Sequence, residues 1–200
     1  MNITNFPVAI VATPRTRSTA LAESLASKFE LKLFNEPYDM FPPPRRADKH
    51  INGVFFEFYD WYKSQRTSRF VVKFMPHQIS VLNPYEQILE DAFKIKLFRE
   101  DKVAQIASFY VASVRGKFFK TSGEPAERFV VPIDRESIFQ AAGFIMNQAY
   151  LIDNLRIDWD YEASYESLGI IDDSSKILSD VPENIDEVNT QVTSLIQKWY

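Results

Sequence analysis

Two arginines and three hydroxyl residues stand together where a predicted strand passes into a predicted helix. They are Arg15, Thr16, Arg17, Ser18 and Thr19. The backbone N–H groups and the positive dipole end at a helix N-terminus attract anions. Guanidinium and hydroxyl donors add hydrogen bonds suited to phosphate or sulfate. We therefore interpret this stretch as a phosphate-binding turn; the alternative is a surface turn whose arginines are merely solvated.

The residues on either side of this turn predict the two elements that position it. The apolar run Val8–Ala12 is short enough for a buried strand and ends at Thr13-Pro14. From Ser18 onward the apolar spacing becomes helical. The turn differs from the nucleotide-kinase pattern GxxxxGK[ST], because the glycines and the lysine of that pattern are missing from it.

A second arginine and hydroxyl follow a later predicted strand, Phe93–Phe98. Arg99 comes directly after it, and Ser108 lies about two turns into the next predicted helix. An arginine at a strand's carboxyl end points into the crevice where open α/β sheets bind ligands. Asp101, Gln105 and Ser108 share one polar face at this spacing. This set suits a ribose phosphate; the alternative is an ordinary amphipathic helix with a capping carboxylate.

Both segments resemble those of one enzyme family. Pro14–Thr19 (PRTRST) looks like the 5′-phosphosulfate-binding loop (PRSGST-like) of sulfotransferases, which use 3′-phosphoadenosine-5′-phosphosulfate (PAPS) on a P-loop-type α/β fold. Ile95–Tyr110 resembles the family's 3′-phosphate-binding segment. Two positions depart from the loop pattern: Thr16 replaces a serine, and Arg17 replaces a glycine, which serves where φ is positive or where backbone approaches a ligand closely.

The resemblance implies roles for three more residues. Asn35-Glu36-Pro37 corresponds to a Glu-Pro pair of the branch similar to bacterial trehalose sulfotransferases, so Glu36 would be the general base; otherwise it is a solvated loop carboxylate. Lys73 resembles the lysine that neutralises charge on the leaving phosphosulfate. His77 is the rival base, or else a surface or half-buried histidine. All three follow or end predicted strands.

Two features near the C-terminus bear on the resemblance. Tyr165–Leu168 (YESL) is similar to the family's late YExL element, whose role is chiefly structural. The basic, glycine-rich loop (RKGxxG-like) of many sulfotransferases has no counterpart between Asp172 and Tyr200. Some sulfotransferase branches lack that loop, so its absence concerns the affinity for the cofactor and does not exclude the sulfotransferase class.

Alternating strand and helix patterns predict an α/β fold, a three-layer sandwich with a mainly parallel central sheet. The resemblance refines this to a P-loop NTPase-like sulfotransferase fold. We expect a single domain over residues 1–200, a lid at Phe41–Arg46 and a loop at Thr121–Pro132. In the helix after Arg99, Val103, Ile106, Tyr110 and Val114 are expected to face the core. The remaining strands are expected at Leu31–Phe34, Phe70–Phe74 and Tyr161–Tyr165, and the helices at Val54–Tyr62, Gln78–Glu90, Glu100–Lys117, Arg135–Ile157 and Ile185–Lys198.

Composition narrows the possible functions. A net charge of −4 argues against broad nucleic-acid binding, which needs a basic surface. There is no cysteine, hence no disulfide or thiolate chemistry, and two histidines make a zinc site improbable. The N-terminal apolar run is too short for a signal sequence or membrane span. We expect a soluble cytoplasmic protein without nucleic-acid or membrane partners.

Together these residues predict a sulfotransferase that moves a sulfuryl group from PAPS to a hydroxyl of a sugar, glycan or small metabolite, releasing 3′-phosphoadenosine-5′-phosphate (PAP) without a metal. Arg15 to Thr19 would hold the 5′-phosphosulfate, and Arg99 with Ser108 the 3′-phosphate. The alternatives are a catalytically silent PAP- or nucleotide-binding module and a kinase-like phosphoryl transferase. The acceptor, the choice of base and the oligomeric state stay open.

Overall fold

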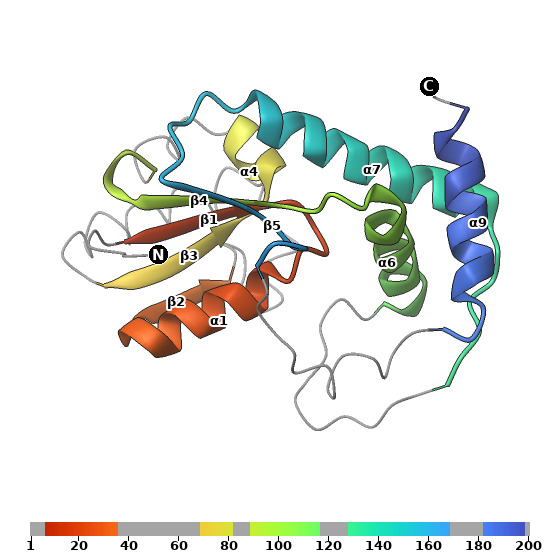
Figure 1. Ribbon diagram of the computed structural model, residues 1–200, viewed down its shortest axis with the longest axis horizontal. Helices are drawn as coiled ribbons and strands as arrows, with labels where there is room; N and C mark the ends of the chain where they lie inside the picture. The colour runs from red at the N-terminus through yellow and green to blue at the C-terminus, as the bar shows by residue number, and fades with distance from the viewer. Residues whose placement is uncertain (1–6, 36–68, 82–88, 117–127, 169–181, 199–200) are drawn as a thin grey trace, which may run out of the picture. The chain divides into compact units, whose positions relative to one another are not determined.

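A parallel sheet forms the frame of the chain. The computed structural model describes residues 7–35, 69–81, 89–116, 128–168 and 182–198. In these ranges five strands pair in the order β2-β3-β1-β4-β5, and all four pairings are parallel (Figure 1). The strands are β1 (Val8–Ala12), β2 (Lys32–Asn35), β3 (Phe70–Phe74), β4 (Phe93–Phe98) and β5 (Tyr161–Ser164). The predicted α/β class with a mainly parallel sheet is confirmed.

Five helices lie in the described ranges. They are α1 (Ser18–Phe29), α4 (Pro76–Val81), α6 (Lys102–Arg115), α7 (Arg135–Asn154) and α9 (Ile185–Ile196). The helix expected at Gln78–Glu90 corresponds to α4, with bounds Pro76–Val81. Within those ranges, none of them combines the length and the apolar content that crossing a membrane requires.

The contacts divide the chain into two compact units. Unit 1 comprises Met1–Phe98 with Gln148–Tyr165, and unit 2 comprises Arg99–Asn147 with Glu166–Tyr200. The five strands belong to unit 1, together with α1, α4 and the last residues of α7. Whether the whole chain is one domain, as expected, stays a prediction.

Unit 1 has three layers, with the sheet in the middle. All residues of β1 and β3 are buried, as expected for inner strands of a sheet covered on both faces. One face packs against Ile79 of α4 and Ile152 of α7. The other face is covered by α1, on the opposite side of the sheet from α4 (Figure 1). Alternation along β3 turns Phe74 towards α4 and Lys73 towards α1.

Unit 2 has its own apolar core. It joins Ile106 and Tyr110 of α6, Ile138 and Ile145 of α7, and Val188 of α9. Asn184, just before α9, bonds both backbone groups of Val131: its Nδ2 donates to the carbonyl at 2.8 Å and its Oδ1 accepts from the N–H at 3.1 Å.

The ends of these helices follow from local chemistry. Asp101 caps α6 by accepting from the Ala104 N–H at 2.9 Å, and Gly116 ends it with φ 64°. Asp134, just before α7, accepts from the Ser137 hydroxyl and from the N–H groups of Glu136 and Ser137. The hydroxyl bond and the two backbone bonds outweigh desolvation and lower the pKa of the Asp134 carboxyl.

Several details differ from the sequence-based expectations. The helix expected from Glu100 begins at Lys102, because Asp101 is its cap, and the helix expected to reach Ile157 ends at Asn154. Val114 was expected in the core but is 42% exposed, whereas Gln105, expected on a polar face, is fully buried. The expected helix Val54–Tyr62, the lid Phe41–Arg46 and residues 82–88 and 121–127 of two other expected segments lie outside the described residues.

Candidate functional site

The turn between β1 and α1 has a backbone conformation usually reserved for glycine. Arg15 and Arg17 have φ values of 62° and 56°, in the left-handed region. This region costs a residue with a Cβ about 1–2 kcal/mol. Thr16, fully buried between them, donates its hydroxyl to the Thr13 carbonyl at 2.8 Å and so braces the turn. Arg17 thus stands where the similar sulfotransferase loop has a glycine, and it has the positive φ that glycine favours.

The N-terminus of α1 has the electrostatics of an anion site. Its N-cap residue is Arg17, whose side chain makes no capping hydrogen bond, and the first turn contains no acidic residue. The first intrahelical bond runs from the Leu21 N–H to the Arg17 carbonyl. The positive end of the helix dipole and the N–H groups of the first turn therefore lie beside two arginines.

A buried lysine approaches the same helix end from the sheet. Lys73, the fourth residue of β3, is 2% exposed, and its Nζ donates to Thr19 Oγ1 in the first turn of α1 at 2.9 Å. Burying an ammonium group is costly unless hydrogen bonds or opposite charge compensate it. The structure thus joins two predicted site residues, Lys73 and Thr19, which are 54 positions apart in the sequence.

The sheet order explains why this edge suits a ligand. The chain leaves β1 towards β2 on one side, whereas it leaves the neighbouring β4 towards β5 on the other. Open α/β sheets bind ligands at the carboxyl ends of strands where the order reverses in this way. The Thr13 N–H, just past β1, donates to the Leu97 carbonyl near the end of β4 at 3.2 Å. The turn therefore begins at the switch point.

Tyr165 supports one of the two arginines. Its N–H donates to the Phe98 carbonyl at 2.7 Å and so extends the pairing of β5 with β4. The Arg17 guanidinium lies over the Tyr165 ring, 5.2 Å from its centroid. A cation–π contact of this kind is worth about 0.5–1 kcal/mol at an exposed site. Tyr165 thus helps to fix the direction of the Arg17 side chain.

Arg99 and Ser108, the expected 3′-phosphate residues, belong to unit 2. The Nε of Arg99 lies 3.7 Å from Glu166 Oε1. The same carboxylate accepts from the N–H groups of Glu100 at 3.0 Å and Asp101 at 3.2 Å. Ser108 is half-buried in α6, and the Lys102 ammonium donates to the Arg99 carbonyl and, at 3.4 Å, to Gln105.

Glu166 thus places a carboxylate of the chain itself beside the start of α6. Burial alone would raise the pKa of its carboxyl, but the backbone N–H bonds and the charge of Arg99 together hold the pKa below its ordinary value. A phosphate at Arg99 would therefore meet a guanidinium whose orientation an acidic residue already fixes.

His77 is held in a defined orientation at the start of α4. Its backbone N–H and its Nδ1 both lie within hydrogen-bond distance of Gln148 Oε1, at 3.2 Å and 3.0 Å. Glu36, the other predicted base, lies outside the described residues. Sequence reasoning missed Gln148 altogether, because a glutamine in a long helix carries no signal of its partner. It noted the Tyr165–Leu168 segment without assigning a contact to Tyr165 or Glu166.

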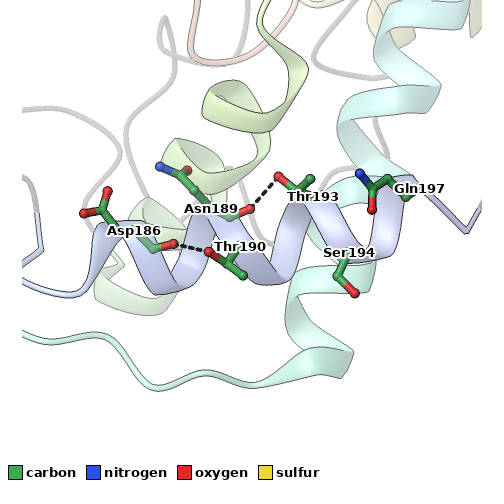
Figure 2. A pocket seen from close by; sticks show the side chains of 6 residues that line it. All are labelled: Asp186, Asn189, Thr190, Thr193, Ser194 and Gln197. Carbon is green, nitrogen blue, oxygen red and sulfur yellow. Dashed lines mark hydrogen bonds between the residues drawn. The ribbon is translucent and has the colours of Figure 1, made fainter.

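A surface hollow in unit 2 differs from this site. Its lining residues are all polar and come from α9: Asp186, Asn189, Thr190, Thr193, Ser194 and Gln197. Figure 2 shows the hydroxyls of Thr190 and Thr193 turned back to carbonyls of their own helix, those of Asp186 and Asn189, at 2.8 Å each. The lining contains no basic side chain, so it does not suit a phosphate or a phosphosulfate.

Comparisons with known proteins leave the family open. The sequence matches no known protein family and no curated protein. Among solved structures, a shikimate kinase from Bacteroides thetaiotaomicron is similar, with a TM-score of 0.48 and 11% identity over 95% of this chain and 97% of that one. At this level of likeness, the match assigns neither a fold family nor an activity to the chain.

Proposed function

We propose that the protein is a sulfotransferase that moves a sulfuryl group from PAPS to an acceptor hydroxyl. One observation carries the proposal: the uncapped N-terminus of α1 adjoins both the left-handed Arg15 and Arg17 and the buried Lys73. Backbone donors, two guanidinium groups and an ammonium group are the chemistry that a phosphosulfate requires.

In this proposal the 5′-phosphosulfate lies against the turn. The N–H groups of α1, the hydroxyls of Ser18 and Thr19 and the two guanidinium groups bind its oxygens. Thr16 contributes by fixing the turn, since its hydroxyl donates to Thr13. Lys73 offsets the charge that builds up on the leaving phosphate as the bond to sulfur breaks. Arg99 and Ser108 hold the 3′-phosphate that distinguishes PAPS and PAP from ADP.

The transfer requires a base and in-line positioning. The acceptor oxygen forms a bond to sulfur, its proton passes to the base, and the bond from sulfur to the 5′-phosphate oxygen breaks to release PAP. Glu36 is the proposed base and His77 the alternative, because both follow strands at the carboxyl edge of the sheet. No step needs a metal ion. The acceptor is proposed to be a sugar, glycan or small metabolite.

A thermal-shift comparison of PAP, ADP and ATP with magnesium tests the donor. At a hundredfold excess over the dissociation constant, a ligand stabilises the native state by about 2.7 kcal/mol, roughly 5–10 °C for this length. We expect that shift with PAP and a much smaller one with ADP. A larger shift with magnesium-ATP than with PAP would instead favour the kinase-like alternative. No shift with any nucleotide would contradict both the sulfotransferase proposal and the kinase-like alternative.

Two variants test the assigned residues. Arg99→Ala should weaken the binding of PAP by about 1.5–3 kcal/mol, the scale of a charged hydrogen bond. The matched control is Arg69→Ala: Arg69 precedes β3 at the opposite edge of the sheet and donates to the Phe29 carbonyl. Glu36→Gln should lower turnover at least about 100-fold while PAP still binds. Near-normal turnover would exclude Glu36 as the base, and PAP binding without transfer to any acceptor would favour the silent module.

A further inference from the structure

We infer that Gln148 is a positioning residue that holds the imidazole of His77 with Nδ1 protonated, leaving Nε2 as the nitrogen able to take a proton from the acceptor. The inference rests on the proposed function, in which His77 is one of two candidate bases. It adds a residue and an atom to that proposal: Gln148 as the partner, and Nε2 as the reacting atom.

The contact has two bonds to one oxygen. Gln148 Oε1 accepts from the His77 backbone N–H at 3.2 Å and lies 3.0 Å from His77 Nδ1. Gln148 is 1% exposed, in the part of α7 that belongs to unit 1, as does α4. The C-terminal turns of α7 lie beside α4 (Figure 1), and Ile152 and Ile79 pack in the same core. A buried amide with this packing has little freedom to turn away.

The backbone bond removes the usual ambiguity about amides and imidazoles. Oxygen and nitrogen of a glutamine amide are easily exchanged in a structure, but the His77 N–H can only be bonded by an acceptor, so the atom facing it is the oxygen. That oxygen carries no proton, and therefore Nδ1 must be the donor in the ring contact. In the neutral imidazole one nitrogen donates and the other accepts, so Nε2 is the acceptor.

The start of α4 is built to hold this residue still. Pro76 occupies the first helical position, where its fixed φ suits the helix. The Gln78 side chain reaches back to the Met75 N–H at 2.7 Å, the reciprocal half of a capping box. His77 lies between them, and Gln148 supplies the acceptor for its N–H. Backbone and ring of His77 are thus fixed together.

The ring lies on the edge of the sheet that holds the candidate site. β3 ends at Phe74, which is in register with Val11 of β1, and His77 follows three residues later. Carboxyl ends of parallel strands meet at one edge, so the chain passes from β3 to His77 at the same edge of the sheet as the β1–α1 turn. Lys73 is four residues before it and bonds Thr19 of α1. A base at this edge is suitably placed for an acceptor that approaches a bound phosphosulfate.

The tautomer can be measured on the protein without any ligand. The chain has two histidines, His50 and His77. In His50→Gln, one imidazole remains, and its long-range ¹H–¹⁵N spectrum at alkaline pH reports which ring nitrogen carries the proton. We expect Nδ1–H and an unprotonated Nε2. Gln148→Met, of similar size but without an acceptor, should shift the ring towards Nε2–H, and Gln148→Glu, which keeps an acceptor oxygen, should restore Nδ1–H. A ring protonated on Nε2 in the His50→Gln protein would overturn the inference without any need for the second variant to fold.

Turnover separates positioning from packing. If His77 rather than Glu36 is the base, Gln148→Met should lower kcat for a demonstrated acceptor at least about tenfold with KM for PAPS little changed, and Gln148→Glu should recover most of the loss. A held tautomer with unchanged kcat in Gln148→Met would show that the contact is structural only and overturn the role in catalysis. Failure of the proposed function itself would appear elsewhere, as loss of PAP selectivity in the thermal-shift comparison, while the tautomer result would stand.

Discussion

The left-handed conformation of Arg17 leads to a prediction that compares two substitutions at one position. Arg17→Ala and Arg17→Gly both remove the guanidinium, and with it the contact to Tyr165 worth about 0.5–1 kcal/mol. Alanine keeps the cost of φ 56°, about 1–2 kcal/mol, which glycine does not have. Glycine is disfavoured by about 0.4–1 kcal/mol because its unfolded chain is more flexible. The Arg17→Gly variant should therefore be more stable than Arg17→Ala by about 1 kcal/mol.

This difference sets the expected order of stabilities. Arg17→Ala should be less stable than the unaltered chain by about 0.5–1 kcal/mol, the value of the lost cation–π contact. Arg17→Gly should be close to the unaltered chain, because the gain in backbone conformation offsets that loss. The preference of helix N-caps for glycine over alanine acts in the same direction. In melting temperature, the gap between the two variants is about 2–4 °C for a chain of this length.

Urea unfolding followed by circular dichroism measures the gap, and α1 offers its own control at the other end. Glu30, the C-cap of α1, has φ 54° and no proposed role in the site. The free energy of unfolding of Glu30→Gly should exceed that of Glu30→Ala by a similar amount. If the Glu30 pair shows the gap and the Arg17 pair does not, Arg17 does not have a positive φ in solution, and the argument for a strained turn fails.

Binding of PAP distinguishes the role of the guanidinium from that of the backbone. Because both Arg17 variants lack the charge, both should bind PAP more weakly, by about 1.5–3 kcal/mol, although their stabilities differ. Arg69→Ala again serves as the control for loss of one positive charge. Affinity equal to that of the unaltered chain in Arg17→Gly would remove Arg17 from the donor site.

Three further changes test other contacts. Thr19→Val removes one acceptor of the buried Lys73 ammonium and should lower the free energy of unfolding by about 1–3 kcal/mol in urea. Thr190→Val, on the exposed face of α9, should lower it by less than about 0.5 kcal/mol, and equal effects would contradict the Lys73 contact. Glu166→Gln should destabilise the chain at neutral pH, because a carboxyl whose pKa is lowered in the folded state adds stability at pH values above its pKa in the unfolded chain. The difference in free energy of unfolding between the variant and the unaltered chain should shrink as the pH falls below the ordinary glutamate pKa of 4.5. A difference that does not change with pH would refute the contacts of Glu166 with Arg99 and the backbone. Asn184→Ala leaves both backbone groups of the buried Val131 without their side-chain partner and should lower the free energy of unfolding by about 1–3 kcal/mol. A decrease of less than about 0.5 kcal/mol, as is usual for surface substitutions, would show that water replaces these bonds.

The sheet could be predicted from the sequence because its strands are short apolar runs with clear ends. Phe70–Phe74 and Phe93–Phe98 were predicted at their observed bounds, and Val8–Ala12 likewise. Helix ends were less predictable, since Asp101 reads equally well as a first-turn residue or as a cap, and only its bond to the Ala104 N–H decides. The burial of Gln105 depends on packing in unit 2, which periodicity within one helix does not contain.

The candidate site was predictable in its charged residues and unpredictable in the residues that hold them. Arginines, a lysine and hydroxyls at strand ends indicate anion chemistry directly. Gln148 and Tyr165 act through other side chains, His77 and Arg17, from positions far away in the sequence. Their partners follow only from how α7 packs on α4 and how β5 pairs with β4. Supporting residues of this kind need a fold before they can be recognised.

The turn after β1 is poorly explained as a simple connection between a strand and a helix. Glycine or asparagine at positions 15 and 17 would adopt the same positive φ at lower cost, and an acidic residue or a serine would cap α1 better than Arg17 does. A lysine ammonium is also buried beside the positive end of that helix, where it donates to Thr19. The two positive φ values and the missing side-chain cap raise the free energy of the folded chain, and the positive charges beside them are favourable towards a bound anion. Backbone strain and like charge gathered at one helix end therefore favour a ligand site over a structural role for this turn.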